Sequence, residues 1–290
     1  MTTTATLALR ENDAAGMMTA LAEDPVLGER TIDASELAPG RWEVVVYFDK
    51  APGKAERAAL ARFGRFAIAE LPETDWVAKS LEGLKPVSAG RFLVHGRHDR
   101  GQLKPNDLGI EIEAGQAFGT GHHGTTAGCL IAIEREAKTR PILNALDVGS
   151  GSGVLAIALA KRAKAHVLAS DIDPVATKVA DENVRLNGVA ARVCCITAMG
   201  LNGRAFARRA PYDLIVANIL AAPLAALAPA IRRAIAPGGT VILSGLLPAQ
   251  RARIVAAYRG RGLVLVRSMI VDGWLTLALR RPAKGGRRAY

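Results

Sequence analysis

Three glycines and a neighbouring acid in the middle of the chain could hold a small ligand. A short apolar strand ends beside Asp147, and a buried-helix pattern begins at Val154. Between them lie three glycines at alternate positions, Gly149, Gly151 and Gly153. A strand, a glycine turn and a helix bring backbone N–H groups and the positive end of a helix dipole to one point. Glycines permit positive φ, close ligand approach and tight helix packing there. The pattern predicts a ligand with a carboxylate or phosphate and a ribose.

A second acid supports the prediction that the ligand contains a ribose. Asp171 ends the next apolar strand, about 20 residues after the glycines, where an acid can accept both ribose hydroxyls. Asp173 competes for this role, but it precedes Pro174 and therefore suits a helix N-cap. An ordinary glycine-rich turn is the alternative interpretation, and the position of Asp171 argues against it.

The spacing of the glycines distinguishes between ligands. The dinucleotide fingerprint needs a glycine where this chain has Val154. The pattern D-x-G-x-G-x-G instead resembles the first motif of class I S-adenosylmethionine-dependent methyltransferases. That resemblance implies S-adenosylmethionine binding by Asp147, Gly149, Gly151 and Gly153, with the acid near the methionine amine.

A reacting residue is predicted at the end of a later strand. Asn218 follows the apolar run 212–217, and the carboxyl ends of parallel strands share one crevice. Its side-chain carbonyl can accept hydrogen bonds from an amine and so position the nitrogen for methylation. Ile219 and Leu220 follow it instead of an aromatic residue, which favours an aliphatic amine over a nucleobase. A strand-end turn asparagine is the alternative.

A second glycine-containing stretch reads AFGTGHHGTTAGCL. Phe118 and Gly119 open a loop that we interpret as a lid over the cofactor, and Thr125 or Thr126 is expected to cap a helix running to Ala137. The alternative is a capped helix with a glycine-rich entry.

No metal site is expected. The three cysteines form neither a disulfide framework nor a zinc spacing, and Cys194 and Cys195 are predicted to be buried. His95 and His98 are three apart without further ligands, which is typical of polar surface residues.

The composition indicates the class of protein and the partners that it could bind. The chain has 290 residues, 50% of them hydrophobic, and a formal charge of +11. This size accommodates a large and a small domain. The charge permits a weak contact with RNA or the ribosome, but it is scattered, only 4% of residues are aromatic, and a solvated surface explains it equally well. The N-terminus carries no secretory pattern, and the uncharged run 214–231 reads as a strand and a covered helix. We expect a cytoplasmic monomer without membrane contact.

Four segments are predicted. Residues 1–71 have the order βαββαβ of a small α+β ferredoxin-like domain, 72–105 form a connector, 106–281 form the cofactor domain, and 282–290 form a basic tail. The cofactor domain alternates strands and helices and ends in a hairpin at Asp272-Gly273. It resembles the α/β, Rossmann-like, seven-stranded sheet of class I methyltransferases.

The combined motifs resemble one family, the methyltransferases of large-subunit ribosomal protein eleven. They span most of residues 72–280 and read WVAKSLEGLKPV, RFLVHGRHDR, AFGTGHHGTT, LDVGSGSGVLAIA, SDIDP, VANIL and VILSG. The resemblance implies docking of the ribosomal protein by the N-terminal domain, and methylation of lysine ε-amines and an N-terminal α-amine. It carries cofactor contacts over to four positions, Thr126, Gly149, Asp171 and Asn218. His122 and Gly124 depart from the family loop F-G-T-G-T-H-P-T-T.

Two other functions remain open at this point. A ribosomal RNA base methyltransferase is favoured by the net charge and opposed by Ile219 and Leu220. A ribosome-binding module without catalysis is opposed by the intact set Gly149, Asp171 and Asn218.

Overall fold

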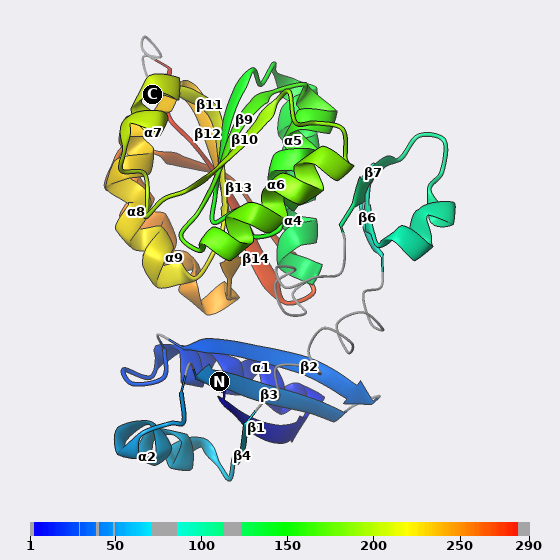
Figure 1. Ribbon diagram of the computed structural model, residues 1–290. Coiled ribbons are helices and arrows are strands. Elements are labelled where there is room, and N and C mark those ends of the chain that lie inside the picture. Colours follow the sequence, from blue (N-terminus) through cyan, green and yellow to red (C-terminus); the bar gives the residue numbers. More distant parts are fainter. Residues whose placement is uncertain are drawn as a thin grey trace. The chain divides into compact units, whose positions relative to one another are not determined.

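The computed structural model describes residues 3–28, 30–38, 41–48, 50–70, 86–112 and 123–283. The chain divides into two compact units, Met1–Gly83 and Leu84–Tyr290, each built around its own sheet (Figure 1).

The first unit has the predicted βαββαβ order. Its elements are β1 (Thr3–Arg10), α1 (Glu11–Glu23), β2 (Thr31–Ala38), β3 (Arg41–Phe48), α2 (Lys54–Phe63) and β4 (Ala67–Glu70). The antiparallel sheet has the strand order β2-β3-β1-β4, which confirms the ferredoxin-like prediction. Val44, Val46 and Phe48, which share one face of β3, are at most 2% exposed, and Val45 on the other face is 9% exposed.

The second unit contains the predicted seven-stranded sheet. Its strands are β8 (Asn144–Val148), β9 (His166–Asp171), β10 (Val193–Thr197), β11 (Tyr212–Asn218), β12 (Ile235–Leu246), β13 (Val264–Val271) and β14 (Trp274–Arg280). The order is β10-β9-β8-β11-β12-β14-β13, and β14 runs antiparallel to both of its neighbours. This confirms the class I methyltransferase architecture with its terminal hairpin.

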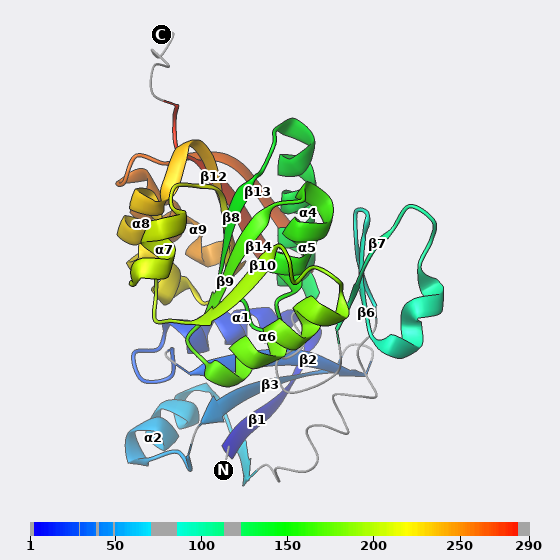
Figure 2. The same cartoon turned by 45° about the horizontal axis from the view of Figure 1, so that its top comes forward.

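Helices cover both faces of this sheet (Figure 1 and Figure 2). One face carries α4 (His123–Thr139), α5 (Val154–Ala163) and α6 (Pro174–Leu186). The other carries α7 (Arg204–Arg209), α8 (Ala221–Ala234) and α9 (Arg251–Arg259). Among the described residues, no helix has the length and apolar character needed to cross a membrane.

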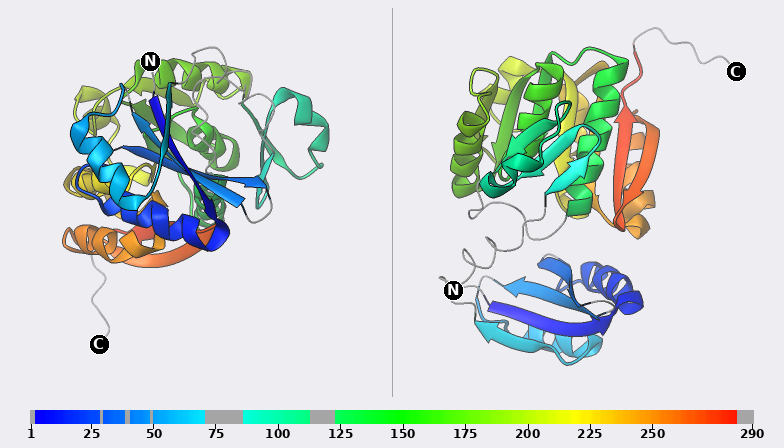
Figure 3. Two further views of the ribbon diagram at one scale, coloured as in Figure 1. Left: turned by 90° about the horizontal axis from the view of Figure 1, so that it is seen from below. Right: turned by 90° about the vertical axis from the view of Figure 1, so that its right-hand side faces the viewer.

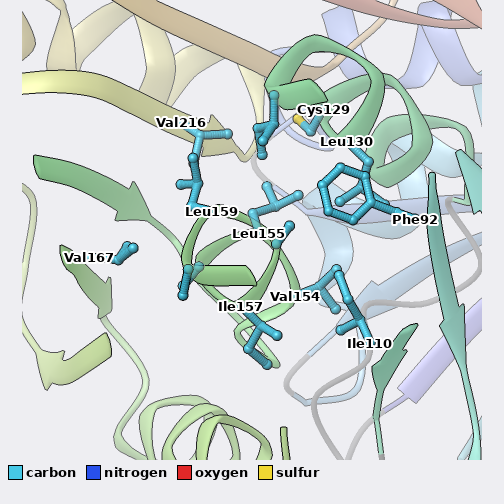
Figure 4. Close-up of a cluster of buried hydrophobic side chains, with 14 of the residues drawn as sticks. Phe92, Ile110, Cys129, Leu130, Val154, Leu155, Ile157, Leu159, Val167 and Val216 are labelled. Carbon is cyan, nitrogen blue, oxygen red and sulfur yellow. The ribbon is translucent and has the colours of Figure 1, made fainter. Parts of the chain in front are cut away.

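Helix α5 is buried on all sides because a third layer covers it. A small sheet of β5 (Val87–Ala89), β6 (Phe92–His95) and β7 (Leu108–Glu111) packs on α4 and α5 (Figure 3). Figure 4 shows the resulting core, in which Ile157 and Leu159 of α5 are fully buried and Phe92 and Ile110 close it from the small sheet. Burying each of these side chains contributes about 1.5–3 kcal/mol. The core thereby fixes the helix that follows the glycine turn.

Several local predictions differ from the structure. The small sheet and the 3-10 helix η1 (Arg97–Gln102) occupy much of the segment 72–105, and α7 was not anticipated. His95 is buried, contrary to prediction, because β6 lies between β5 and β7; His98 is exposed as predicted. Cys194 is exposed and Cys195 half-buried, so their predicted burial is wrong, since β10 is an edge strand.

Candidate functional site

The glycine turn after β8 needs glycine for two reasons. Gly149, Gly151 and Gly153 have φ values of +70°, +51° and +84°, which lie in the left-handed region. A Cβ on Gly149 would lie 2.3 Å from Cγ2 of Ile219, and one on Gly153 would lie 3.3 Å from Cα of Ala180. The turn therefore passes directly against the segment that follows Asn218.

Most of the donors of this turn are used within the protein. The N–H groups of Gly149 and Ser150 donate to the Ser170 carbonyl at 2.8 and 3.0 Å. Gly151 N–H donates to Oδ2 of Asp171 at 2.8 Å. A pyrophosphate would need such N–H groups itself. The turn consequently has few N–H groups left for a phosphate.

Asp171 ends β9 at the rim of the turn and is half-buried. Besides Gly151 N–H, its carboxylate accepts the N–H of Asp173 through Oδ1 at 3.0 Å. These bonds hold both oxygens in place, and each oxygen retains a further lone pair for a hydroxyl donor. Asp173 accepts Val175 N–H at 2.8 Å as the N-cap of α6, which confirms that prediction.

Asp147 lies beneath the turn and is fully buried. Its Oδ2 accepts Ala156 N–H at 3.0 Å, so it binds a first-turn donor of α5. Oδ1 has no hydrogen-bond partner among the described residues. Burial, with a smaller contribution from the negative charge of Asp171, raises the pKa of Asp147 to about 7 in spite of the lowering effect of the Ala156 hydrogen bond. Asp147 thus ties the first turn of α5 to the end of β8.

Asn218 ends β11, with Ser244 of β12 as its neighbour in the sheet. Its Nδ2 donates to Oγ1 of Thr125 at 3.2 Å. Its Oδ1 has no partner among the described residues and remains available as an acceptor. The side chain is therefore oriented by its amide nitrogen, with its carbonyl free for a donor.

Sequence analysis missed a chain of buried hydroxyl groups behind Asn218. Ser244 Oγ donates to the Thr125 carbonyl at 3.2 Å and lies 2.9 Å from Oγ1 of Thr276. Thr125, Ser244 and Thr276 are each no more than 5% exposed. Thr125 does not cap α4, because the helix begins at His123, so its hydroxyl can accept from Asn218 instead. The hydroxyl residues within VILSG and WLTL were the available signal.

The loop before α4 is described only in part. Thr126 lies on α4 and is half-buried, whereas Phe118, Gly119 and His122 lie outside the described residues. A Cβ on Gly124 would lie 2.6 Å from the Val271 carbonyl, so the β13–β14 hairpin leaves no room for a side chain there.

Three of the predicted site positions meet at one edge of the sheet. Gly149 follows β8, Asp171 ends β9 and Asn218 ends β11, and these parallel strands are neighbours in the order β9-β8-β11. Their carboxyl ends lie side by side at the edge where ligands bind in open parallel sheets. No cluster of three metal-binding side chains occurs within the described segments.

Known proteins are similar to this chain in sequence and in architecture. The family model described as ribosomal protein L11 methyltransferase (PrmA) matches residues 2–282. A ribosomal protein L11 methyltransferase of Rhizobium leguminosarum bv. trifolii is 52% identical over 267 residues, which is 90% of each chain. One from Agrobacterium fabrum is 58% identical over 211 residues, covering 73% of this chain and 72% of that one. The crystal structure of a ribosomal protein L11 methylase from Lactobacillus delbrueckii subsp. bulgaricus is similar with a TM-score of 0.61 and 30% identity, over 69% of this chain and all of that chain.

Proposed function

The chain belongs to the ribosomal protein L11 methyltransferase family, and we propose that it methylates amines of ribosomal protein L11 with S-adenosylmethionine. The observation that carries the proposal is Asn218, whose amide nitrogen is fixed by Thr125 while its carbonyl remains available in the crevice. The proposed acceptors are lysine ε-amines and the N-terminal α-amine.

The cofactor is assigned to the crevice from the chemistry of its residues. Asp171 would accept the ribose hydroxyls, since its oxygens are held in place and retain lone pairs. The turn at Gly149, Gly151 and Gly153 would lie against the cofactor, and Thr126, Phe118 and Gly119 would contact it from the loop and α4. Asp147, with one buried oxygen unpaired, is the carboxyl group closest in sequence to the turn and would attract the methionine amine. S-adenosylmethionine supplies a methyl group on a sulfonium sulfur.

Asn218 would act by positioning the acceptor. Its Oδ1 accepts one N–H of a neutral amine, which aims the nitrogen lone pair at the methyl carbon. The cofactor would supply its methyl group to this nitrogen with its sulfur as the leaving group, and the methylated amine would release a proton to water. A lysine amine has an ordinary pKa of about 10.4, so only its neutral fraction reacts. We assign the deprotonation to a step before binding.

The residues after Asn218 favour an aliphatic amine. Ile219 packs against the glycine turn, and Leu220 is 50% exposed. Neither offers an aromatic ring on which a nucleobase could stack. A flexible lysine side chain needs no such platform.

The ferredoxin-like unit is proposed to dock the ribosomal protein. Its sheet and core are complete within Met1–Gly83, whereas Gly149, Asp171 and Asn218 all lie in the second unit. Removal of the first unit should leave S-adenosylmethionine affinity intact and strongly lower methylation of the whole ribosomal protein, because docking raises the effective concentration of the target amine. A short lysine peptide should lose little. Equal methylation of the whole substrate with and without this unit would place recognition elsewhere.

The main test is mass spectrometry of ribosomal protein L11 after incubation with S-adenosylmethionine and the enzyme. We expect added methyl groups on lysine and N-terminal amines with the wild type, and a loss on the order of 100-fold or more in single-turnover rate with Asn218→Ala. Asn144→Ala, a change of an asparagine at the opposite end of a neighbouring strand, is the control for general damage. Unmodified substrate in the presence of bound cofactor would refute the proposed acceptor.

A further inference from the structure

The charge of the second unit is concentrated in its last third. Residues 219–283 contain nine arginines and no lysine, and Asp272 is their one acid. This segment alone accounts for a net charge of +8 out of the +11 of the whole chain. The sequence-based description of the charge as scattered therefore needs correction.

Folding brings several of these arginines together at one end of the sheet. Arg232, in the last turn of α8, donates through Nε to the Arg261 carbonyl at 2.8 Å. Arg281 donates through Nη1 to the Ile235 carbonyl at 2.6 Å, and burial, together with the charge of Arg232, lowers the pKa of Arg281. Arg259 ends α9 and is exposed, as is Arg261. We refer to Arg232, Arg259, Arg261 and Arg281 as the arginine cluster.

Counter-charges are scarce at this cluster. Glu136 pairs with Arg140 at 3.3 Å and with Arg280 at 3.0 Å, which neutralises part of the neighbouring charge. No carboxylate in the described part of the chain pairs with the four members of the cluster. Favourable interaction with helix C-termini explains Arg232 and Arg259, but Arg261 and Arg281 lie outside helices. Like charges held together without acids indicate an anionic partner.

The cluster lies away from the crevice. Arg280 pairs in the sheet with Thr240 at the start of the parallel run of β12, whereas Asn218 pairs with Ser244. Four strand residues separate these positions by about 13 Å. A partner on the cluster would leave the carboxyl ends of the strands open.

We propose that the arginine cluster binds the phosphate backbone of double-helical RNA. The guanidinium fork matches the paired oxygens of a phosphate, and lysine is absent from the segment. The chain segments 236–239 and 259–262 offer alanine, proline, glycine and arginine, without aromatic side chains for stacking on bases or for insertion into lipid. The choice of RNA rests on the proposed function, since a ribosomal protein is found together with RNA.

Fluorescence anisotropy of the full chain with a labelled RNA duplex of about 20 base pairs tests this, over about 50–300 mM KCl. The test variant is Arg259→Gln/Arg261→Gln. The matched control, Arg251→Gln/Arg253→Gln, removes the same charge from exposed side chains at the other end of α9. Each lost phosphate contact should lower the magnitude of the log–log salt slope by roughly 0.9, so the test variant should lose about 2 and bind about tenfold or more weakly at 0.1 M salt. The control should bind within about twofold of the wild type.

Three outcomes would overturn the proposal. These are absence of RNA binding by the wild type at 50 mM salt, equal weakening in both variants, and tighter binding to phosphatidylglycerol vesicles or poly-glutamate than to RNA. Methylation of isolated ribosomal protein L11 should be unchanged in the test variant. RNA binding that persists without any methylation would contradict the proposed function and leave this inference standing.

Discussion

The hydrogen bond from Asn218 to Thr125 makes a specific prediction about catalysis. Thr125→Val keeps the shape of the side chain and removes the hydroxyl that accepts Asn218 Nδ2 at 3.2 Å. Losing a neutral hydrogen bond costs about 0.5–1.5 kcal/mol. At that cost the ratio of correctly oriented to inverted Asn218 amide falls about 2- to 12-fold, because the amide can then rotate and present its NH2 group to the substrate amine. Single-turnover methylation should fall by at most this factor while S-adenosylmethionine affinity stays unchanged.

A double-mutant cycle separates this positioning role from general damage. In an Asn218→Ala background, Thr125→Val should have little further effect, because the group that it orients is already gone. Thr139→Val is the matched control, since Thr139 lies at the other end of α4 and its hydroxyl also makes a hydrogen bond, to the Glu136 carbonyl at 2.9 Å. Equal rate losses for Thr125→Val with and without Asn218 would refute the reasoning, as would a full rate in the single variant.

Three further predictions follow from the turn and its acids. Asp171→Ala should weaken S-adenosylmethionine binding by roughly 1–3 kcal/mol in calorimetry. Asp173→Ala should lower stability by about 1 kcal/mol through the lost N-cap and leave cofactor affinity intact. Equal cofactor affinities of the two variants would contradict the assignment of Asp171 to the ribose. Gly149→Ala should lower the unfolding temperature, because its Cβ would meet Ile219, and adding Ile219→Ala should restore only part of the loss since φ stays positive; an unchanged melting curve would contradict this. The pKa of Asp147 is higher in the folded than in the unfolded protein, so its ionisation opposes folding increasingly between about pH 4 and pH 7. Asp147→Asn should therefore raise the free energy of unfolding, measured with denaturant, by up to roughly 4 kcal/mol at pH 8 and not at all near pH 4. A difference that does not depend on pH would contradict the burial argument.

The sheet could be predicted because local signals and tertiary structure agree. Apolar strands ended at turn residues and alternated with helical patterns, and Asp272-Gly273 marked the closing hairpin. Positions at strand ends, such as Asp171 and Asn218, could be placed in one crevice because parallel strands point the same way. The sequence pattern therefore predicted the strands and helices, and the parallel direction of the strands predicted which of their ends lie together.

Side-chain partners could not be predicted in the same way. The contact of Thr125 with Asn218 spans 93 residues, and that of Ser244 with Thr276 directly joins the neighbouring strands β12 and β14. His95 looked like a surface residue because its strand has only four residues and too short a pattern to reveal two neighbours. Such features depend on which elements meet, which local spacing does not encode.

The glycine turn of this chain differs from a dinucleotide-binding turn in its hydrogen bonds as well as in the spacing of its glycines. In this chain Asp147 binds Ala156 N–H and Asp171 binds Gly151 N–H, so two carboxylates already occupy the donors at the start of α5. A phosphate placed there would compete with those carboxylates and meet their repulsion. A cofactor with a cationic amine and sulfonium would suit this point, because the negative charge of Asp171, and of Asp147 where it is ionised, favours positive charge. We therefore infer that the two acids favour a cationic ligand, whereas the glycines determine how closely it can approach.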